Sequence, residues 1–517
     1  MKPGIHEQQD LQTLHAYTTQ VCIIGSGCGG ATLAQQLAKK GLDVVVLERG
    51  GYYPPEKMDQ NELNMQGKLY GGRGLDTTSD GGNTLLYGNN VGGASVHYWA
   101  DSYRTPQYKL DEWQEQYGVR NHQTRDLEPA FDALERELSI HEAPDSLFNP
   151  LNQRFRQASQ SLGWHGHRVP QARTHCQKSG HCMQGCIYGA KQDQTVTHLP
   201  DAIEHGARVF ADSRAESLSF EGRRAKRLRV SLMDRKSNRP SGQEYTVEAD
   251  VFVVAAGGFS SSHFLLRQGL GDDLPALGRH FSMNPSTMVY GLFEEDMRQW
   301  RNIPAAWGVD EFLQRQEDEG RYREGGYLLM PNQIHPGALA ATLPLKGEQL
   351  GEWMAQFPQL AGTIAWMDDI PEELGEIRMR RDGGRQVHYP YGALTRQVLK
   401  DSVAKQLEML FAMGARKAVI SGHQAMMFNS MDDMAQLDDL ATGGGGLIMA
   451  SPHPGGGCRM GDDPAQSVVG SDHRVHGYDN LFVSDSSVFP TSSALDPSLS
   501  IMAFSHMAAN HVLETFS

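Results

Sequence analysis

The sequence lacks the features that would place the protein in several large classes. Its 517 residues include only 6 cysteines, too few for a disulfide scaffold. No stretch approaches the roughly 18 apolar residues of a membrane span, so we expect no direct membrane insertion. Positive charge is scarce, because 47 Lys and Arg face 62 Asp and Glu, which gives a formal net charge of −15. Nucleic acid is therefore not an expected partner.

The opening residues contain no basic segment followed by an apolar run, so the sequence predicts no signal peptide. The length favours two or three domains, each able to bury a substantial interior. An apolar content of 39% together with 56 glycines indicates a globular, loop-rich protein.

The strongest local pattern is "QVCIIGSGCGGATLAQQLAKKGLDVVVLERGG". A short apolar run, residues 21–24, leads into Gly25, Gly27 and Gly30 in G-x-G-x-x-G spacing, and a second apolar run ends at Glu48, 23 residues after Gly25. Such glycines allow a tight turn and close approach of a phosphate, the helix N-terminus faces the pyrophosphate, and the carboxylate binds a ribose hydroxyl. The pattern predicts dinucleotide binding; the alternative is a glycine-rich turn in an ordinary α/β domain.

Half of the cysteines are crowded into "THCQKSGHCMQGCIYGAKQ", where Cys176, Cys182 and Cys186 span eleven residues. A disulfide uses thiols in pairs, whereas a metal or iron–sulfur centre can use an odd number. Structural zinc with His175 or His181 as a fourth ligand is one alternative. A Cys176–Cys186 or Cys182–Cys186 disulfide that leaves one free thiol is another.

Three further blocks resemble the glucose–methanol–choline (GMC) oxidoreductases. They are "LLYGNNVGGASVHYWADSYRTP" (85–106), "ADVFVVAAGGFSSSHFLL" (249–266) and the C-terminal stretch from "SPHPGGGCRMG" to residue 512. The resemblance implies FAD as the cofactor. It also implies an α/β fold, with a Rossmann-like FAD-binding domain and an α+β substrate domain containing an antiparallel sheet.

In this family the FAD domain is assembled from separated segments, and the resemblance assigns these to 15–110, 195–285 and 450–517. The substrate domain is then expected over 111–194 and 286–449, with 174–192 as a cysteine-rich cluster segment.

The C-terminal block carries the expected catalytic groups. His453 in "HPGGGCRMG" matches the family histidine beside the flavin and the substrate hydroxyl. Oxidation of an alcohol requires removal of the hydroxyl proton, and histidine titrates near neutral pH, so we expect His453 to be the general base.

The usual second histidine or asparagine is replaced by Asp496 in "ALDPSLSI". An ionised aspartate only accepts hydrogen bonds, so Asp496 could hold a cationic His453 or bind a polar hydrogen of the substrate; in a dry site it could be protonated. The role of this second expected catalytic residue stays open, with a turn-forming Asp-Pro as the alternative.

Further residues are expected near the cofactor by the same resemblance. Asp485 follows a strand and is expected near the ribityl chain or pyrophosphate, and the helix after Pro497 would direct its N-terminus at the flavin ring. Some relatives attach FAD covalently through a histidine in the setting of His97, and others carry a free histidine there. Besides Gly25, Gly27, Gly30 and Glu48, the expected cofactor-binding residues are Gly92, Gly93, Ser95, His97, Asp485, Pro497 and Ser498.

The C-x5-C-x3-C spacing is similar to that of bacterial GMC dehydrogenase catalytic subunits, in which three cysteines bind a [3Fe-4S] cluster. Thiolates suit iron–sulfur centres, and such a cluster accepts electrons singly. The resemblance implies a small accessory subunit and a cytochrome or quinone acceptor. The expected location is the cytoplasm, or the periplasm if a signal-bearing partner subunit is exported with this chain.

The sequence therefore predicts an FAD-dependent dehydrogenase that oxidises the CH–OH group of a sugar, polyol or other polar alcohol and passes electrons through the cluster. The preference for a polar substrate comes from Asp496. One alternative is an oxygen-using alcohol oxidase with a structural cysteine segment. An alternative of another class is an electron-transfer flavoprotein without its own substrate.

Overall fold

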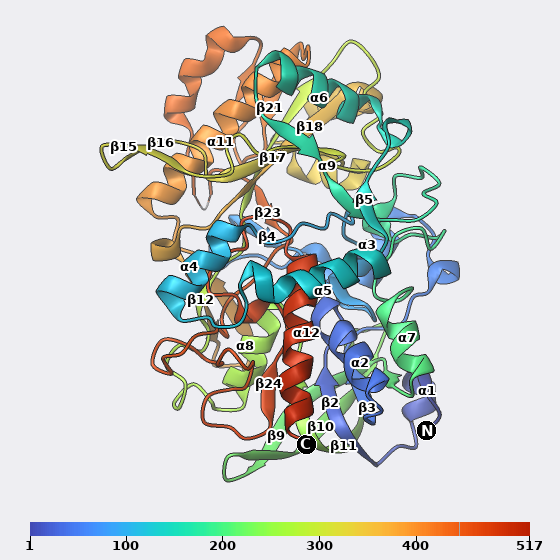
Figure 1. Ribbon diagram of the computed structural model, residues 1–517. Coiled ribbons are helices and arrows are strands. Elements are labelled where there is room, and N and C mark those ends of the chain that lie inside the picture. The colour runs from blue at the N-terminus through green and yellow to red at the C-terminus, as the bar shows by residue number, and fades with distance from the viewer. Residues whose placement is uncertain (444, 517) are drawn as a thin grey trace.

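The computed structural model describes residues 1–443 and 445–516. Two β-sheets dominate the chain, one at each end of the molecule, with helices between and around them (Figure 1). The first sheet has the strand order β1-β8-β3-β2-β11-β10-β9, and β24 pairs with β11. Its strands are β1 (Gly4–His6), β2 (Ala16–Ile24), β3 (Val44–Leu47), β8 (Arg208–Phe210), β9 (Ser213–Glu221), β10 (Arg224–Asp234), β11 (Arg239–Val254) and β24 (Leu481–Val483).

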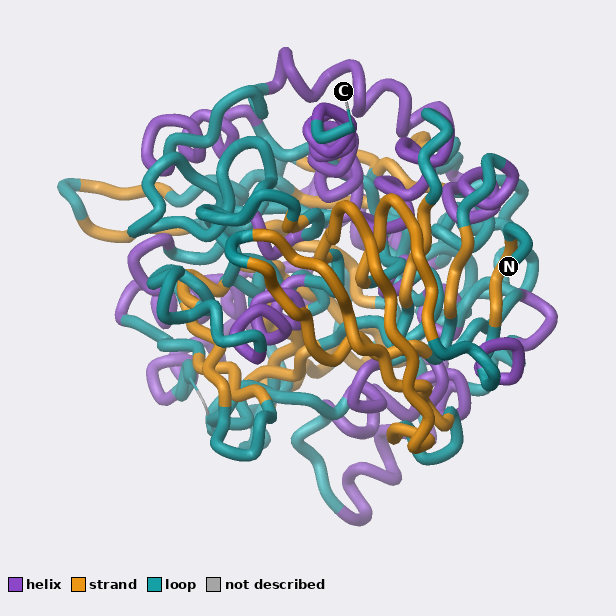
Figure 2. Tube along the Cα trace, turned by 90° about the horizontal axis from the view of Figure 1, so that it is seen from below, coloured by secondary structure: helices purple, strands orange, loops and turns teal. Residues whose placement is uncertain are grey.

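The central strands of the first sheet are parallel: β2 pairs with β3 and β11, and β11 pairs with β24. β9 and β10 extend the sheet in antiparallel fashion. Figure 2 shows these strands side by side, with α12 (Ser498–Glu514), which carries the C-terminus, over one face. α12 packs on α2 (Cys28–Lys39), which also contacts α7 (His198–Glu204).

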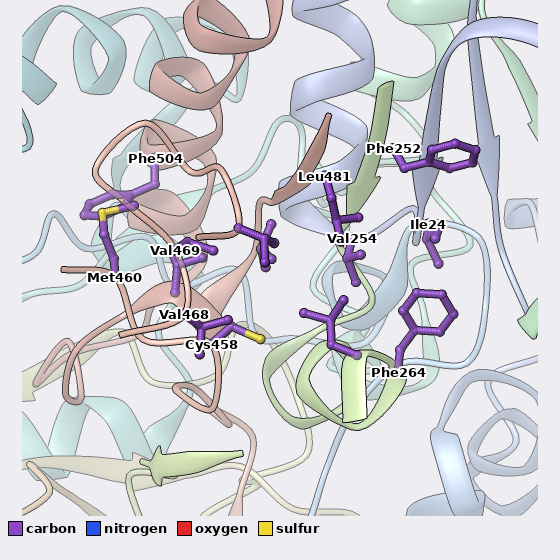
Figure 3. Close-up of a cluster of buried hydrophobic side chains, with 14 of the residues drawn as sticks. Ile24, Phe252, Val254, Phe264, Cys458, Met460, Val468, Val469, Leu481 and Phe504 are labelled. Carbon is purple, nitrogen blue, oxygen red and sulfur yellow. The ribbon is translucent and has the colours of Figure 1, made fainter. Parts of the chain in front are cut away.

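β2 shows why the chain forms a buried parallel strand here. Successive strand residues point to opposite faces, and Val21 and Ile23 belong to the core under α2 whereas Cys22 and Ile24 belong to the core on the other face. A strand covered on both faces reads as a continuous apolar run. Figure 3 shows part of the core that contains Cys22 and Ile24. In it, Ile24, Phe252, Val254 and Leu481 lie with Phe264 of α8 (Gly258–Arg267).

The second sheet has the order β22-β21-β13-β18-β17-β14-β6, and β23 pairs with both β13 and β4. These pairs are antiparallel except for β23 with β4. α11 (Ala393–Ala412) packs against β13 and β18. The strands are β4 (Asn83–Leu85), β6 (Gly166–Arg168), β13 (Ser286–Leu292), β14 (Trp307–Val309), β17 (Tyr327–Asn332), β18 (Leu360–Met367), β21 (Lys417–Ile420), β22 (Met427–Phe428) and β23 (Met449–Ser451).

Smaller elements complete the chain. The helices are α1 (Gln8–Leu11), α3 (Glu62–Leu69), α4 (Gln107–Tyr117), α5 (Thr124–Glu137), α6 (Pro150–Ser161), α9 (Pro336–Thr342) and α10 (Gly347–Ala355). The strands are β5 (Ile140–Glu142), β7 (Pro170–Ala172), β12 (Arg279–Phe281), β15 (Gln316–Asp318), β16 (Arg321–Glu324), β19 (Gly375–Met379) and β20 (Arg385–His388). Within the described ranges, no helix combines the length and the apolar character needed to cross a bilayer.

The arrangement confirms the predicted α/β fold with a Rossmann-like unit and a second, largely antiparallel sheet. Strands from all three segments expected to form the FAD domain meet in the first sheet, as β2, β11 and β24. β4, which comes from the first of those segments, instead pairs with β23 of the second sheet. This pairing brings the chain after β4 and after β23 to the carboxyl ends of the parallel strands, where ligands bind in such sheets.

Candidate active site

The glycine loop between β2 and α2 is closely packed against neighbouring backbone. Gly25 has φ +112°, and a Cβ there would lie 2.1 Å from the carbonyl oxygen of Ala255. A Cβ on Gly30 would lie 2.0 Å from the carbonyl oxygen of Gly25. Side chains at these positions are therefore excluded, and the N-terminus of α2, capped at Gly27, stays open to an approaching phosphate.

Glu48 follows β3 and lies against this loop. Its carboxylate accepts hydrogen bonds from the Ser26 hydroxyl at 2.7 Å, from the Ser26 amide at 3.2 Å and from the Gly50 amide at 2.8 Å. Burial raises the pKa of Glu48, while these three donors oppose the shift. The carboxylate is thus held rigidly at the end of β3.

A cavity of about 260 Å³, here called the central cavity, runs from the glycine loop to His453. Residues that are far apart in sequence line it because the carboxyl ends of β2, β3, β11 and β24 meet the chain that follows β4 and β23. The lining includes Gly25, Gly27, Glu48, Gly93, Ala94, Arg214, Phe259, His453, Asp485, Pro497 and Ile501. An extended dinucleotide fits this donor set, with a helix N-terminus at one end and the histidine at the other.

The loop before His97 closes one wall of the central cavity. The Gly92 amide donates to the Ser26 hydroxyl at 3.0 Å, and a Cβ on Gly93 would lie 2.8 Å from the Gly27 Cα. The Ser95 hydroxyl donates to the Gly92 carbonyl at 2.7 Å and accepts from the Gln194 amide at 3.1 Å. Gly92 and Ser95 thereby shape the loop, while Gly93 and Ala94 line the cavity.

His97 lies outside the lining of the central cavity. Its ring stacks on that of Tyr70 with centroids 3.8 Å apart, and the Tyr70 hydroxyl donates to the carbonyl of Met183 in the cysteine segment. Burial, aided by the charge of Lys191, lowers the pKa of His97 to about 3. At neutral pH the imidazole is therefore uncharged, and its stacking partner Tyr70 is the residue that contacts the cysteine segment.

His453 follows β23 and is held at both ring nitrogens. Nδ1 lies 3.2 Å from Oδ1 of Asn284, whose amide nitrogen donates to the Met367 carbonyl. The Asn284 oxygen therefore faces the imidazole and accepts a hydrogen bond from Nδ1–H. Nε2 lies 3.1 Å from Oδ1 of Asp496. The ring of Trp366 packs on His453 at a centroid distance of 5.1 Å.

The structure therefore brings together the two residues expected to be catalytic, although they are separated by 42 positions in sequence (496 − 453). Sequence reasoning missed Asn284. The only local signal there is an Asn-Pro pair, which indicates a turn and says nothing about a partner at position 453.

Asp485 lies at the end of β24, as expected, and lines the central cavity. Its Oδ1 accepts from the Ser487 amide and its Oδ2 from the Gly257 amide, each at 2.8 Å. Burial raises the pKa of this carboxyl, and the two amides and two hydroxyls oppose the shift. Pro497 lines the cavity at the N-cap of α12, while the Ser498 hydroxyl donates to the Asp101 carbonyl at 3.1 Å.

Cys176, Cys182 and Cys186 line one small pocket together with Arg173 and Lys191; we call this set the cysteine pocket. All six cysteines of the described chain are free thiols, so the disulfide alternative is not seen. Across residues 1–443 and 445–516, no three His, Cys, Asp or Glu side chains are placed to hold one metal ion. Neither a zinc set with a histidine nor a set of three converging thiols is therefore formed among these residues in this structure.

Two buried cationic side chains, Arg173 and Lys191, line the cysteine pocket. Arg173 Nη1 donates to the Cys182 sulfur at 3.4 Å, and although burial opposes its charge, the nearby cysteines leave the pKa of Arg173 raised. Lys191 Nζ donates to the carbonyls of Val96, Tyr98 and Cys182 at 2.6, 3.1 and 2.9 Å. Lys191 thus ties the loop beside the central cavity to the cysteine pocket. Neither cation has a motif signal in the sequence.

Comparison with known proteins gives the same assignment along most of the chain. Residues 66–286 and 371–505 match the two models of the GMC oxidoreductases, and residues 23–53 match an NAD(P)-binding Rossmann-like domain. A GMC-type oxidoreductase of Mycobacterium tuberculosis, itself uncharacterized, is 29% identical over 95% of this chain and 75% of its own length. A long-chain-alcohol oxidase of Arabidopsis thaliana is 27% identical over 99% of this chain and 70% of its own.

Solved structures share the fold at low sequence identity. Pyridoxine 4-oxidase from Mesorbium loti has a TM-score of 0.71 at 16% identity, covering 96% of this chain and 99% of its own. A formate oxidase of Aspergillus oryzae RIB40 has a TM-score of 0.72 at 14% identity, covering 97% and 99%. Together with the family models and the central cavity, these matches show that the chain belongs to the GMC oxidoreductases and is an FAD-dependent enzyme acting on alcohol-type donors.

Proposed function

We propose that the protein is a dehydrogenase that oxidises the CH–OH group of an alcohol to the carbonyl, with His453 as general base and Asp496 as its partner. The observation that carries the proposal is the His453–Asp496 pair, with Nε2 and Oδ1 3.1 Å apart, at one end of the central cavity. Bound FAD would supply hydride acceptance. The glycine loop, Glu48 and Asp485 would hold it along the cavity.

The contacts of His453 suit a base. Asn284 accepts at Nδ1, so the neutral imidazole keeps its proton there and leaves the Nε2 lone pair to take the hydroxyl proton. The imidazolium that forms then faces Asp496 at 3.1 Å, and an ionised carboxylate at that position stabilises it. Such a pair favours proton removal as the carbon is oxidised.

The side chains around His453 indicate how polar the alcohol is next to its reacting carbon. The expectation of a polar alcohol rests on Asp496, and that carboxylate is engaged with His453. Trp366 packs on His453 and belongs to one apolar cluster with Trp99 and Leu495. We therefore propose an alcohol whose carbon skeleton is apolar next to the reacting carbon, a proposal supported by the name of the Arabidopsis long-chain-alcohol oxidase.

We further propose that Cys176, Cys182 and Cys186 hold a [3Fe-4S] cluster, which would supply one-electron chemistry. The cluster would pass electrons to an external cytochrome or quinone. A small accessory subunit would accompany the chain. Three thiols with two buried cations suit an anionic cluster in donor type and charge. The pocket's free volume, about 10 Å³, is that of one water molecule, so the cysteine side chains must move apart to admit a cluster. Tyr188 in its wall is 54% exposed, which puts the pocket near the surface.

An oxidase that returns electrons to oxygen is the second candidate, favoured by the names of the Arabidopsis relative and of both solved neighbours. Two measurements separate the candidates. Alcohols of increasing apolar length are tested for bleaching of the flavin absorbance, and reoxidation is then followed with oxygen and with a one-electron dye. Rapid peroxide formation and less than about one iron per chain after anaerobic purification would refute the dehydrogenase and its cluster.

A further inference from the structure

Asp101 is a buried carboxyl group that none of the sequence motifs assigns to the site. It is 1% exposed, and its backbone forms a β-bridge with Gln171. The Gln171 side-chain amide donates to Oδ1 at 2.6 Å. Oδ2 is buried and has no hydrogen-bond partner among the described residues. An ionised carboxylate with a single donor is costly in such a place, so the second oxygen calls for a proton or a partner.

Asp496 also has one carboxyl oxygen that lacks a hydrogen-bond partner. Its Oδ1 faces Nε2 of His453, and its Oδ2 is buried without a partner in the part of the chain that the structure describes. The start of α12 binds back to Asp101, because the Ser498 hydroxyl donates to the Asp101 carbonyl at 3.1 Å. After burial, the negative charge of Asp496 is the largest cause that raises the pKa of Asp101 well above its usual range.

The backbone beside both carboxyl groups is strained. Ala100, directly before Asp101, has φ +79°, and Ala494, two residues before Asp496, has φ +63°. Residues with a Cβ rarely adopt this left-handed region, and such strain persists where surrounding contacts impose it, often at active sites. The Ala100 carbonyl accepts from the Ala172 amide at 2.9 Å, and the Ala494 amide donates to the Ser492 hydroxyl at 3.0 Å.

We propose that Asp101 and Asp496 hold one proton between them, so that a carboxyl pair lies behind His453. One Oδ2 carries the proton and the other accepts it, which satisfies both unpartnered atoms. Two like charges at close range do not both ionise, which is the general reason for a shared proton in such pairs. Asp101 is then a positioning residue that acts on His453 through Asp496.

The consequence for the reaction rests on the proposed role of His453 as base. The hydroxyl proton of the alcohol moves to Nε2, and the carboxyl pair, with one vacant proton site, takes it from Nε2 through Oδ1 of Asp496. The O–H bond breaks and an N–H bond forms, then that N–H bond breaks and a carboxyl O–H bond forms. No electrons are transferred in either proton step. His453 returns to its neutral form while the product is still bound.

Other polar and charged groups surround the Asp101–Asp496 pair and affect where its proton lies. Arg173 Nε donates to Oε1 of Gln171 at 2.9 Å, which turns the Gln171 amide nitrogen toward Asp101. Asp101 therefore meets a neutral amide in place of the cation. The titratable or charged groups that interact with the pair are His453, Arg173, Cys182, Tyr98 and Tyr103.

Infrared difference spectroscopy of the FAD-loaded protein tests the pair directly. We expect Asp101→Asn to remove a protonated-carboxyl C=O band, because Asp496 beside His453 then ionises. We expect Asp496→Asn to shift the same band, because the buried Asp101 keeps its proton but loses the carboxylate that accepts it. Asp111→Asn is the matched control, since Asp111 accepts from the Gln107 amide at the same 2.6 Å on the protein surface. Its spectrum in this region should equal that of the unmodified protein.

A second readout is the pH profile of flavin reduction. In Asp101→Asn the full negative charge resides on Asp496, which stabilises the imidazolium, so the acid limb should move to higher pH by about one unit. A carboxyl region that is unchanged in either variant overturns the proposal. If Asp101→Asn does not fold, Asp496→Asn and Gln171→Leu decide, and both must shift the band, because each removes one hydrogen-bond partner of the protonated Asp101. The infrared result does not depend on turnover, so a failed substrate proposal is distinguishable.

Discussion

The central cavity and the cysteine pocket lie on either side of the loop that carries His97, and they are built in opposite ways. The central cavity has about 260 Å³ of free volume and is walled by glycine backbone and by the carboxylates of Glu48 and Asp485. The cysteine pocket has about 10 Å³ and is walled by thiols and two buried cations. The first is preformed for an extended organic cofactor, whereas the second is closed in this structure.

The two regions also differ in the sign of their buried charges, which are negative in the central cavity and positive beside the cysteines. Backbone amides and hydroxyls satisfy the acidic groups of the central cavity, and backbone carbonyls and sulfur satisfy Arg173 and Lys191. Lys191 binds both regions at once, through Val96 and Tyr98 on one side and Cys182 on the other. The central cavity and the cysteine pocket are therefore mechanically joined but electrostatically distinct. A substitution in one region should leave the function of the other intact.

The largest expected effect is on the central cavity. Gly25→Ala places a Cβ where the Ala255 carbonyl lies 2.1 Å away, at a φ of +112°, so we expect loss of bound FAD and of all activity. The flavin absorbance per purified chain measures it. Gly67→Ala in α3 is the control: its Cβ meets no atom within 4 Å, and it should keep FAD while stability stays equal or rises by about 1 kcal/mol. Full flavin content in Gly25→Ala would contradict the assignment.

His453→Ala tests the base without disturbing the glycine loop. We expect alcohol-driven flavin reduction to fall by about 10²- to 10⁴-fold with FAD still bound, because general base catalysis is lost. Stopped-flow bleaching of the flavin measures the rate. His165→Ala, which breaks a surface His–Asp contact with Asp310, is the matched control and should reduce at the normal rate. A normal rate in His453→Ala would remove His453 from the mechanism.

Cys182→Ala acts on the cysteine pocket alone. We expect iron to fall from about three per chain to near zero, with the rate of flavin reduction by alcohol retained. Metal and sulfide analysis of anaerobically purified protein measures the first, and stopped-flow absorbance the second. Cys22→Ala, a buried thiol in β2 away from the pocket, should keep its iron. Iron-free unmodified protein would end the cluster proposal and leave the pocket structural.

The smallest expected effect is at His97, between the two regions. Its folded-state pKa of about 3 lies below the unfolded value near 6.5, so the folded protein binds the proton less well than the unfolded chain. Stability is therefore present at neutral pH and lost as pH falls from 6.5 toward 3, at about 1.4 kcal/mol per pH unit. His97→Phe should make the loss between pH 6.5 and pH 5 smaller by about 2 kcal/mol.

Denaturant unfolding at the two pH values measures the His97 effect. Tyr70→Phe keeps the ring that stacks on His97 and should retain the pH dependence of the unmodified protein. An identical pH dependence in His97→Phe would show that this imidazole titrates normally.

The parts of the fold that the sequence predicted well are those encoded by local spacing. The apolar run ending at Ile24, the glycine loop and the run ending before Glu48 became β2, α2 and β3, since strand and helix periodicities are properties of neighbouring residues. The family resemblance, confirmed by the family models, supplied the overall fold. The segment boundaries and the roles of the cofactor and catalytic residues stay predictions.

Other features needed the folded chain. Asp101 lies within residues 85–106, which carry the family resemblance, but no sequence motif assigns it a role. Its partners Gln171 and Asp496 lie 70 and 395 residues away (171 − 101 and 496 − 101), and no pattern in the sequence links them.

By itself, then, the sequence determined the dinucleotide loop, because this loop depends on spacing along a short length of chain. The resemblance of its other blocks implied the family and the fold class. Only the tertiary structure decided that Asn284 and Asp496 address the two nitrogens of His453, that Arg173 and Lys191 are buried beside the cysteines, and that His97 stacks on Tyr70 away from the central cavity. The physical reason is that these contacts join residues from segments that are far apart in sequence, and the packing of those segments, not local propensity, sets the geometry.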